Sequence, residues 1–593
     1  MKILLTAINA KYIHSNLAVY SLKASSGRYR DDVEIAEYTI NNYIDEILSS
    51  IYIKKPDLIA FSCYIWNIDM VLELIDLFHK VAGDVPVWVG GPEVSYDARA
   101  VLEKNPGITG VMCGEGEATF RELLACYEET FGGDLRAGNV MDFWKRLEQV
   151  QGLVFRSWDQ TIVATGERPP LAMDDLPFPY EDLKAFDHKI IYYESSRGCP
   201  FRCSYCLSSI DKRVRFRSTE LVKKELQLFL DARVEQVKFV DRTFNCSHSH
   251  TLDIWRVIRD HDNGVTNFHF EISADLLNEE ELKLLADLRP GLVQLEIGVQ
   301  STNRQTIEAI DRTMDFEALS GIVSRIQEAH NVHQHLDLIA GLPYEDLESF
   351  KKSFNDVYRL RPQQLQMGFL KVLKGSKMHR VQKSYDLVYR TKPVYEVMST
   401  RWLSFDDVLA LKQIEEMVEI YYNSTQFFNT LDYFLHFFNT PYEMFETLAH
   451  WYSRTTTDGA SHSRLARYGI LEEFAKTEGK RRGIDPKAAR SVLVYDLYLR
   501  ENVKNRPDWA WKESDYKDDV AAFYSDPAKR QQYLSGHDGE SYRQVRHQTH
   551  LERFEIDVAA AVKRGETLDK EQWILFDYTK RDPLTYEAWR QIL

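Results

Sequence analysis

Three clustered cysteines are the residues in this sequence with the clearest capacity for chemistry. Cys199, Cys203 and Cys206 have the spacing C-x3-C-x2-C, between a short β-type run at 190–193 and a helix-like stretch that opens at Ser218. A loop at the C-terminal end of a strand is where α/β folds place functional residues. Three thiolates can hold three corners of a [4Fe-4S] cluster and leave the fourth iron open. The spacing therefore predicts an iron–sulfur cluster with a free coordination position.

A zinc site is the alternative for such a trio. Structural zinc takes four ligands, commonly as two C-x2-C pairs, and no second pair occurs in this chain. The other cysteines are isolated, and we expect small buried side chains there. An odd total of 7 cysteines favours a reducing compartment over a disulfide framework. We expect a cytoplasmic protein.

The cysteine loop resembles the radical S-adenosylmethionine (SAM) superfamily. The resemblance is carried by the spacing, by the aromatic Tyr205 before the last cysteine, and by Ser196-Arg197-Gly198 before the first. In that superfamily SAM chelates the open iron, and its reductive cleavage yields a 5′-deoxyadenosyl radical. The resemblance implies bound SAM and an external electron donor such as flavodoxin or ferredoxin.

The stretch 190–375 alternates strand-like and helix-like segments. Strands are expected at 190–194, 236–240, 267–272, 292–299, 334–340 and 364–370. Six βα units match the open partial (β/α)6 barrel of the radical SAM fold, with the site at the C-terminal strand ends.

Polar residues at these strand ends resemble the SAM contacts of the superfamily. Asp241 would meet the amino group of SAM, the segment from Glu296 onward would meet ribose and carboxylate, and Gly341 would pack on adenine. The residues assigned to SAM are Tyr205, Asp241, Glu296, Gln300, Ser301, Arg312 and Gly341. Ordinary alternatives are solvated charges at Asp241 and Glu296, a surface arginine at 312, and turn geometry at Gly341 and Gly298.

The stretch 1–131 also alternates strands and helices, which predicts a parallel, doubly wound sheet. The ligand of such a sheet lies beyond the carboxyl ends of its strands. Glycine-rich turns fall at two of these ends, Gly90-Gly91 and Gly114-Glu115-Gly116. Glycine there lets the backbone approach a flat ligand, although each turn taken alone could simply be tight.

Together with Ser62-Cys63-Tyr64-Ile65-Trp66-Asn67, these turns resemble the Rossmann-like cobalamin-binding domain that precedes many radical SAM domains. The implied cobalamin contacts are Ser62, Tyr64, Trp66, Asn67, Gly90, Gly91, Gly114, Glu115 and Gly116. The D-x-H-x-x-G motif that supplies a histidine to cobalt in mutase-type domains is absent. We therefore expect no protein imidazole on cobalt.

The remaining stretches are expected to be a linker and a helical domain. Residues 132–189 contain many prolines and one hairpin at 152–155 and 161–164, which favours a surface linker. Residues 376–593 have Leu, Phe, Tyr and Trp at helical spacing, which predicts an all-α C-terminal domain. His333 and His335 lie on a probable strand without a nearby carboxylate pattern, so no metal site is predicted there.

The composition of the chain disfavours two classes of partner, nucleic acids and membranes. The net charge of −16, from 74 Lys+Arg against 90 Asp+Glu, and the absence of a long basic run disfavour nucleic-acid binding. Charged residues interrupt the most apolar window, 57–78, so no membrane span is expected. The substrate class stays open among a small molecule, a lipid precursor and a peptide.

The chain as a whole resembles a bacterial branch of cobalamin-binding radical SAM proteins with a helical C-terminal domain. The resemblance implies a C-methyltransferase acting at an unactivated carbon through methylcobalamin and a 5′-deoxyadenosyl radical. Two alternatives stay open. One is cyclisation or rearrangement with the same cofactors and no methyl transfer. The other is a non-catalytic iron–sulfur redox sensor or binding protein.

Overall fold

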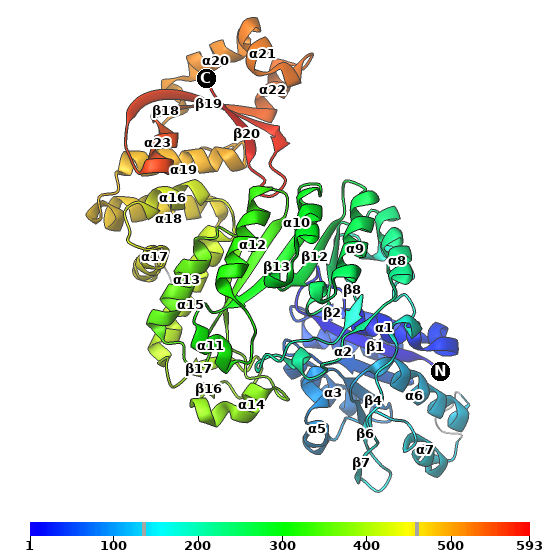
Figure 1. Cartoon of the computed structure of the whole chain (residues 1–593). Helices are drawn as coiled ribbons and strands as arrows, with labels where there is room; N and C mark the ends of the chain where they lie inside the picture. Colours follow the sequence, from blue (N-terminus) through cyan, green and yellow to red (C-terminus); the bar gives the residue numbers. More distant parts are fainter. Residues whose placement is uncertain (133–137, 457–461) are drawn as a thin grey trace.

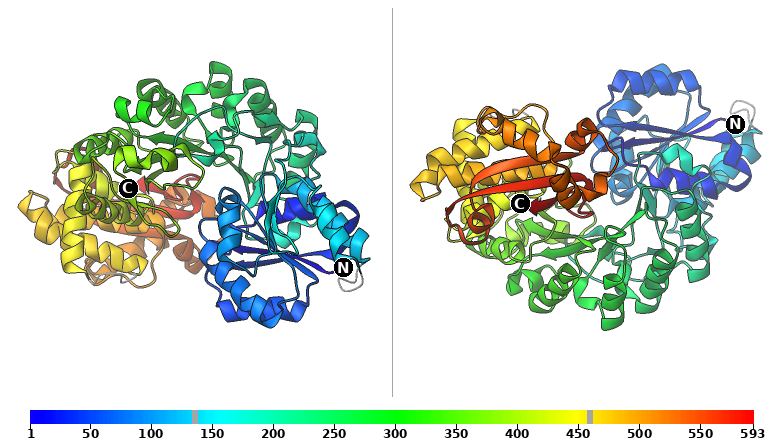
Figure 2. Two further views of the ribbon diagram at one scale, coloured as in Figure 1. Left: turned by 90° about the horizontal axis from the view of Figure 1, so that it is seen from below. Right: turned by 90° about the horizontal axis from the view of Figure 1, so that it is seen from above.

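The computed structural model describes residues 1–132, 138–456 and 462–593. It contains an N-terminal domain (residues 3–164), a barrel (residues 191–369) and a C-terminal domain (residues 405–592), coloured blue to cyan, cyan to green, and yellow to red in Figure 1. The two views in Figure 2 show the barrel as an open arc of strands and helices. Among the described residues, no helix is both long and apolar enough to cross a bilayer.

The N-terminal domain is built on the predicted doubly wound sheet. Its parallel strands are β2 (Val33–Thr39), β1 (Ile3–Asn9), β3 (Leu58–Ser62), β4 (Val87–Gly90) and β5 (Gly110–Met112), in that spatial order. The order reverses direction between β1 and β3. Ligands of doubly wound sheets bind at such a switch point.

Helices cover both faces of this sheet and form two separate apolar cores. One face carries α1 (Leu17–Ser25) and α6 (Gly116–Phe131). The other carries α2 (Ile44–Lys54), α3 (Ile68–Val81) and α5 (Ala98–Lys104). The strands are buried on both faces, which explains their nearly continuous apolar sequences.

The expected hairpin is confirmed, but it belongs to the N-terminal sheet. β6 (Leu153–Arg156) pairs antiparallel with β5, and β7 (Ile162–Ala164) pairs with β6. Leu153 and Phe155 are buried in the core beneath α6 and α7 (Val140–Leu147). The expectation that this hairpin is part of a surface linker is wrong, because its apolar side chains complete the sheet.

The barrel confirms the predicted six βα units. Its parallel strands follow one another in sequence order: β8 (Ile191–Tyr193), β11 (Gln236–Phe239), β12 (Asn267–Ile272), β13 (Val293–Gln300), β14 (His333–Ala340) and β15 (Gln364–Phe369). The outer helices are α8 (Thr219–Asp231), α9 (His248–Asp260), α10 (Glu279–Ala286), α12 (Phe316–Glu328) and α13 (Leu347–Tyr358). β8 and β15 are the two edges, so the barrel is open.

The C-terminal domain begins as the predicted helical region. Its main helices are α15 (Phe405–Met417), α16 (Phe428–Leu435), α17 (Pro441–Thr455), α18 (Arg464–Phe474) and α19 (Pro486–Arg500). The aromatic side chains mostly form core, as expected: Tyr421, Phe434 and Tyr442 are all buried. This core is continuous with the core of the barrel.

The expectation of an all-α C-terminal domain is wrong for its last segment. β18 (Thr549–Ile556), β19 (Asp569–Arg581) and β20 (Ala588–Ile592) form an antiparallel sheet against α19. Phe554 and Phe576 of this sheet contact Tyr495 of α19. A helix that is buried all round needs such a second covering layer.

We predict that Gly110→Ala destabilises the N-terminal sheet. A Cβ at position 110 would lie 2.3 Å from a ring carbon of Trp88 and 2.9 Å from Cβ of Phe155. Overpacking of this kind costs about 1–3 kcal/mol. Native-state hydrogen exchange at the β5 amides should report that loss. Gly166→Ala is the matched control, because a Cβ there meets no atom within 4 Å. Equal protection in both variants would contradict the prediction.

Candidate functional site

The cysteine loop is closed at its base by two short strands. β9 (Ser196–Arg197) pairs antiparallel with β10 (Arg215–Phe216), just beyond β8. Gly198 has φ +99°, and a Cβ there would lie 2.3 Å from the carbonyl oxygen of Arg213. The Cys199 amide donates to the Asp211 carbonyl at 3.1 Å. Glycine at 198 is therefore required by the close approach of the two chains.

The three cysteines line one cavity of about 180 Å³ at the C-terminal strand ends of the barrel. Cys199 Sγ lies 3.6 Å from Thr243 Oγ1, and Cys203 Sγ lies 3.7 Å from Arg312 Nη1. All three thiols are free. Three thiols facing a common cavity next to an arginine form a donor set that suits a cluster with one open iron.

Four residues assigned to SAM also line this cavity: Tyr205, Glu296, Gln300 and Arg312. Two of their buried polar atoms, Gln300 Oε1 and Arg312 Nε, have no hydrogen-bond partner among the residues that the structure describes. The register of β13 shifts between Gly298 and Gln300, and Gln300 has φ +71°. A Cβ at 298 would lie 2.3 Å from Gln300 Nε2, so any other residue there would displace the Gln300 side chain. Such unpartnered atoms fit a polar ligand.

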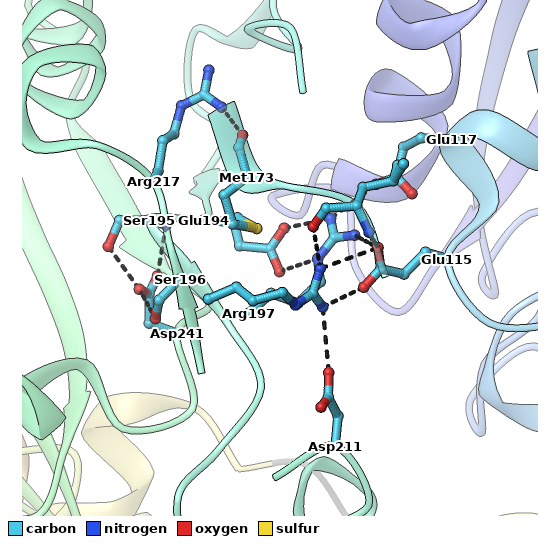
Figure 3. Close-up of polar contacts among 12 residues, drawn as sticks. Glu115, Glu117, Met173, Glu194, Ser195, Ser196, Arg197, Asp211, Arg217 and Asp241 are labelled. Atoms are coloured by element: carbon cyan, nitrogen blue, oxygen red, sulfur yellow. Dashed lines mark hydrogen bonds and ion pairs between the residues drawn. The ribbon is translucent and has the colours of Figure 1, made fainter. Parts of the chain in front are cut away.

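The structure does not bring the other three SAM-assigned residues to the cavity wall. Asp241 is fully buried and accepts from the Ser195 amide at 3.0 Å, the Ser195 hydroxyl at 2.7 Å and the Ser196 hydroxyl at 2.6 Å, as Figure 3 shows. Ser301 donates to Glu345 at 2.6 Å. A Cβ at Gly341 would lie 2.7 Å from Val397. Asp241 and Ser301 hold neighbouring backbone in place, and Gly341 permits a close approach.

The cavity-lining residues that were not assigned to a site from the sequence include five polar ones in or just after strands: Arg242, Thr243, Glu271, Ser273 and Asp337. Their only sequence signal is a position in or just after a strand. Burial raises the pKa of Glu271 to about 7. Alternation of side chains along a strand decides which of two neighbours faces the cavity, and a sequence leaves that choice open at strand ends.

A row of charged and polar side chains continues from the cavity into the barrel. Glu296 accepts from Lys238 Nζ and His269 Nε2, each at 3.0 Å. Burial alone would raise the pKa of Glu296, but these two donors hold it well below its usual range. Glu296, His335 and Asp337 place ligand atoms within 4.8 Å of one another. The expectation that no carboxylate stands near His335 is therefore wrong, although Lys238 already neutralises Glu296.

A second, larger cavity of about 630 Å³ lies at the β1/β3 switch point of the N-terminal sheet. It is lined by eight of the nine residues assigned to cobalamin: Ser62, Tyr64, Trp66, Gly90, Gly91, Gly114, Glu115 and Gly116. Asn67 is the exception, because its side chain is buried against the backbone of Ile8, Ser62 and Tyr64. The volume is typical of sites for small molecules and cofactors.

The walls of the large cavity suit a flat ligand. Gly91 has φ +113°, and a Cβ there would lie 2.5 Å from the Cys63 carbonyl oxygen. Gly114 has φ +76° and open space where a Cβ would stand. The rings of Tyr64 and Trp66 stack at 4.5 Å. Glycine at 91 is required by the close approach of the Cys63 backbone, whereas the open space at Gly114 lets a planar group approach the backbone of that turn.

One histidine, His14, belongs to the lining of the large cavity. Its Nδ1 lies 2.8 Å from the Tyr192 hydroxyl. Burial lowers the pKa of His14. This imidazole comes from the β1–α1 loop and not from a D-x-H-x-x-G motif.

The two cavities adjoin. Arg242 and Glu271 line both of them, and their charged groups lie 3.8 Å apart. A ligand in the large cavity and one beside the cysteines would therefore meet across this pair.

We predict a pH signature from Asp241. Burial raises its pKa from 3.8 to about 6. The native state then binds more protons than the unfolded state between these values, so the unfolding free energy falls as pH rises from 4 to 6. The shift of the Asp241 pKa changes the unfolding free energy by about 3 kcal/mol over this pH range. Urea unfolding of the cofactor-free protein at pH 4.5 and 7.5 should show this slope, and Asp241→Asn should make it shallower, while buried carboxylates such as Glu271 supply the rest.

The control for this prediction is Asp231→Asn, at an exposed carboxylate. That variant should keep the wild-type slope. Parallel pH curves for wild type and Asp241→Asn would refute the assignment.

Family models match three consecutive regions of the chain. Residues 3–124 match the B12 binding domain, residues 193–357 the radical SAM superfamily, and residues 383–576 a protein family of unknown function, DUF4080.

Curated relatives are similar at modest identity. A cobalamin-dependent radical SAM methyltransferase, TokK, from Streptomyces tokunonensis is 26% identical over 363 residues, covering 58% of this chain and 50% of the relative. The hopanoid C-3 methylase of Methylococcus capsulatus is 26% identical over 312 residues, 49% of this chain and 54% of the relative. The chain spans about half the length of such relatives.

Solved structures share the fold. The cobalamin-dependent SAM radical enzyme OxsB aligns with a TM-score of 0.55 at 16% identity, over 95% of this chain and 83% of that one. The radical SAM methyltransferase TsrM from Kitasatospora setae aligns with a TM-score of 0.52 at 17% identity, over 67% and 79%. The chain therefore carries a B12-binding domain followed by a domain of the radical SAM superfamily, and it shares its fold with these solved structures.

Proposed function

We propose that this protein is a cobalamin-dependent radical SAM enzyme that transfers a methyl group to an unactivated carbon of its substrate. The observation that carries the proposal is the pair of adjoining cavities, one with three free thiols and one at the glycine turns of the N-terminal sheet. A radical SAM methyltransferase of this type needs two cofactor sites that face one substrate. The names of the relatives support the same reaction class.

Each residue set would have a defined task. Cys199, Cys203 and Cys206 would hold the cluster, and the glycine turns would hold the corrin. When bound, the cluster with SAM supplies a 5′-deoxyadenosyl radical, and cobalamin supplies a transferable methyl group. The chain itself binds and orients the cofactors and the substrate, and it excludes water from the site. Exclusion of water matters because a carbon radical is quenched by any stray hydrogen donor.

The SAM site would be built mainly by Tyr205, Gln300 and Arg312. The Arg312 guanidinium is fixed by Cys203 Sγ and the Gly298 carbonyl, which leaves its buried Nε for an anionic group. Gln300 offers a buried, unpartnered amide oxygen to a donor such as a ribose hydroxyl. Phe201 and Ile272 are apolar members of the wall and limit access of water. Asp241 and Ser301 would act indirectly, by positioning the backbone.

The substrate would bind where the cavities meet. Arg242 and Glu271 present charged groups there, which favours a substrate with a polar group near the reacting carbon. An external electron donor would reduce the cluster. Free thiols at all seven cysteines suit the reducing cytoplasm.

A second candidate reaction is cyclisation. An anaerobic magnesium-protoporphyrin IX monomethyl ester cyclase from Rubrivivax gelatinosus is also similar, at 20% identity over 342 residues. The two reactions differ in their SAM products, so one measurement separates them.

We predict that methyl transfer leaves two SAM products in nearly equal amounts. The reconstituted enzyme would be incubated anaerobically with SAM, a reductant and small molecules extracted from the protein as purified. One SAM would give S-adenosylhomocysteine and another 5′-deoxyadenosine, together with a product in which a methyl group replaces one hydrogen of the substrate. Deoxyadenosine without S-adenosylhomocysteine would reject methyl transfer and favour cyclisation.

The cluster prediction is tested separately. Anaerobic reconstitution should give about four iron and four sulfide per chain. Cys203→Ala should lose most of this iron. Cys246→Ala is the matched control, since Cys246 lies near the loop but does not line the cavity. Full iron content in Cys203→Ala would rule out the proposed cluster.

A further inference from the structure

We propose that Arg197 is a positioning residue that couples the corrin-contacting loop of the N-terminal domain to the cysteine loop of the barrel. The inference rests on the proposed function, because it concerns how the two cofactor sites are held relative to each other. It assigns to one side chain the task of transmitting the occupancy of one site to the other.

The N-terminal side of this coupling is the turn between β5 and α6. Gly114, Glu115 and Gly116 line the large cavity, and so does Glu117 in the first turn of α6. Figure 3 shows Glu115 and Glu117 directed toward the barrel. The turn that would touch the corrin therefore also supplies carboxylates to the neighbouring domain.

Arg197 receives these carboxylates together with one from its own domain. Its Nη2 lies 2.8 Å from Glu117 Oε1 and 2.7 Å from Glu194 Oε2, and its Nη1 lies 3.3 Å from Glu115 Oε2. Its side chain is only 20% exposed, and that of Glu117 is 8% exposed. Because little water reaches this cluster, its charge-assisted hydrogen bonds fix the relative positions of the side chains.

Arg197 stands at the base of the cysteine loop. It lies opposite Arg215 in the β9–β10 pair, two residues before Cys199. Arg215 also pairs with Glu115 and lies 3.3 Å from Asp211. Glu115 thus bridges both strands that close the loop.

The opposite side of the same strand is fixed as well. Asp241 holds Ser195 and Ser196 from within the barrel. Residues 195–197, which lead into the cysteine loop, are therefore held on one side by Asp241 and on the other by the Glu115–Glu117 turn. A displacement of that turn by a bound corrin would move Arg197, and with it the position of Cys199.

Lysine cannot replace arginine in this arrangement. A guanidinium presents a planar fork of donors to several carboxylates at once, whereas an ammonium is a point charge. Arg197→Met would also take the shared cation from Glu117 and Glu194 and leave Glu115 paired with Arg215 alone. Both variants should uncouple the sites.

The experiment measures a thermodynamic cycle. The dissociation constant of hydroxocobalamin would be determined by anaerobic equilibrium dialysis for protein with and without the reconstituted cluster. We expect the two constants of the wild type to differ by about tenfold, within the usual range of coupling between sites. In Arg197→Met and Arg197→Lys the ratio should fall to near one.

Two controls separate coupling from general damage. Tyr395→Phe removes the 2.7 Å hydrogen bond to Glu93, another contact of the N-terminal domain near a glycine turn, without touching the cysteine loop. Arg146→Met removes an exposed ion pair with Glu129 of α6. Both variants should keep the wild-type ratio. Glu117→Gln provides an independent change on the carboxylate side, should Arg197 variants fail to fold, and should lower the ratio.

The outcomes are distinguishable. A wild-type ratio near one, or an unchanged ratio in the Arg197 and Glu117 variants, would overturn the coupling while leaving the cofactor proposal intact. Loss of coupling in Tyr395→Phe as well would also overturn the specific role of Arg197. No cobalamin binding by either form of the wild type would overturn the proposed function together with this inference.

Discussion

The hydrogen bond from the Ile190 amide to the Ile13 carbonyl, at 2.7 Å, joins the backbones of the N-terminal domain and the barrel just before β8. An open barrel has an edge strand with unpaired backbone groups, which must be covered. Here the β1–α1 loop of the N-terminal domain covers the β8 edge, through this bond and through Ser15 Oγ donating to the Ile190 carbonyl at 2.9 Å. That loop lies at the switch point of its own sheet. Covering the edge therefore also brings the two cavities together.

The other edge of the barrel is covered by the C-terminal domain. The side-chain amide of Asn423 accepts from the Leu365 amide at 2.9 Å and donates to the Leu365 carbonyl at 3.0 Å, as a neighbouring strand would. Beyond β15, the Val397 amide donates to the Leu370 carbonyl at 2.9 Å. The region that matches a family of unknown function therefore completes the barrel.

The sequence was sufficient for the two parallel sheets because their strands are buried and their turns carry glycine at the ends. The sequence was not sufficient to decide which individual side chains face the cavities. Asp241 and Arg242 are adjacent, yet Asp241 bonds to Ser195 and Arg242 lines both cavities, because successive side chains at a strand end point in opposite directions. Tyr205 and Gln300, which were assigned from the same resemblance as Asp241, do line the cavity, so the resemblance located the segments but did not decide which of their side chains face it.

The missed antiparallel sheet has a different physical cause. Its inward positions include a charged residue: Glu552 of β18 is fully buried and accepts from Arg506, Trp511 and Tyr516. Burial of the carboxylate opposes ionisation, but His550 and Arg506 lower the pKa of Glu552 to about 2. A buried carboxylate with partners on distant segments interrupts the apolar alternation by which strands are predicted.

The domains are joined in two different ways. The C-terminal domain shares one continuous apolar core with the barrel, whereas the N-terminal sheet has two cores of its own. Contacts of the N-terminal domain with the rest of the chain include ion pairs and hydrogen bonds at Arg197, Tyr395 and Lys374. Apolar cores resist shear because their packing is dense. The N-terminal domain also packs the ring of Tyr20 on Tyr180 and Phe186, so its interface combines polar pairs with one small apolar contact instead of a shared core.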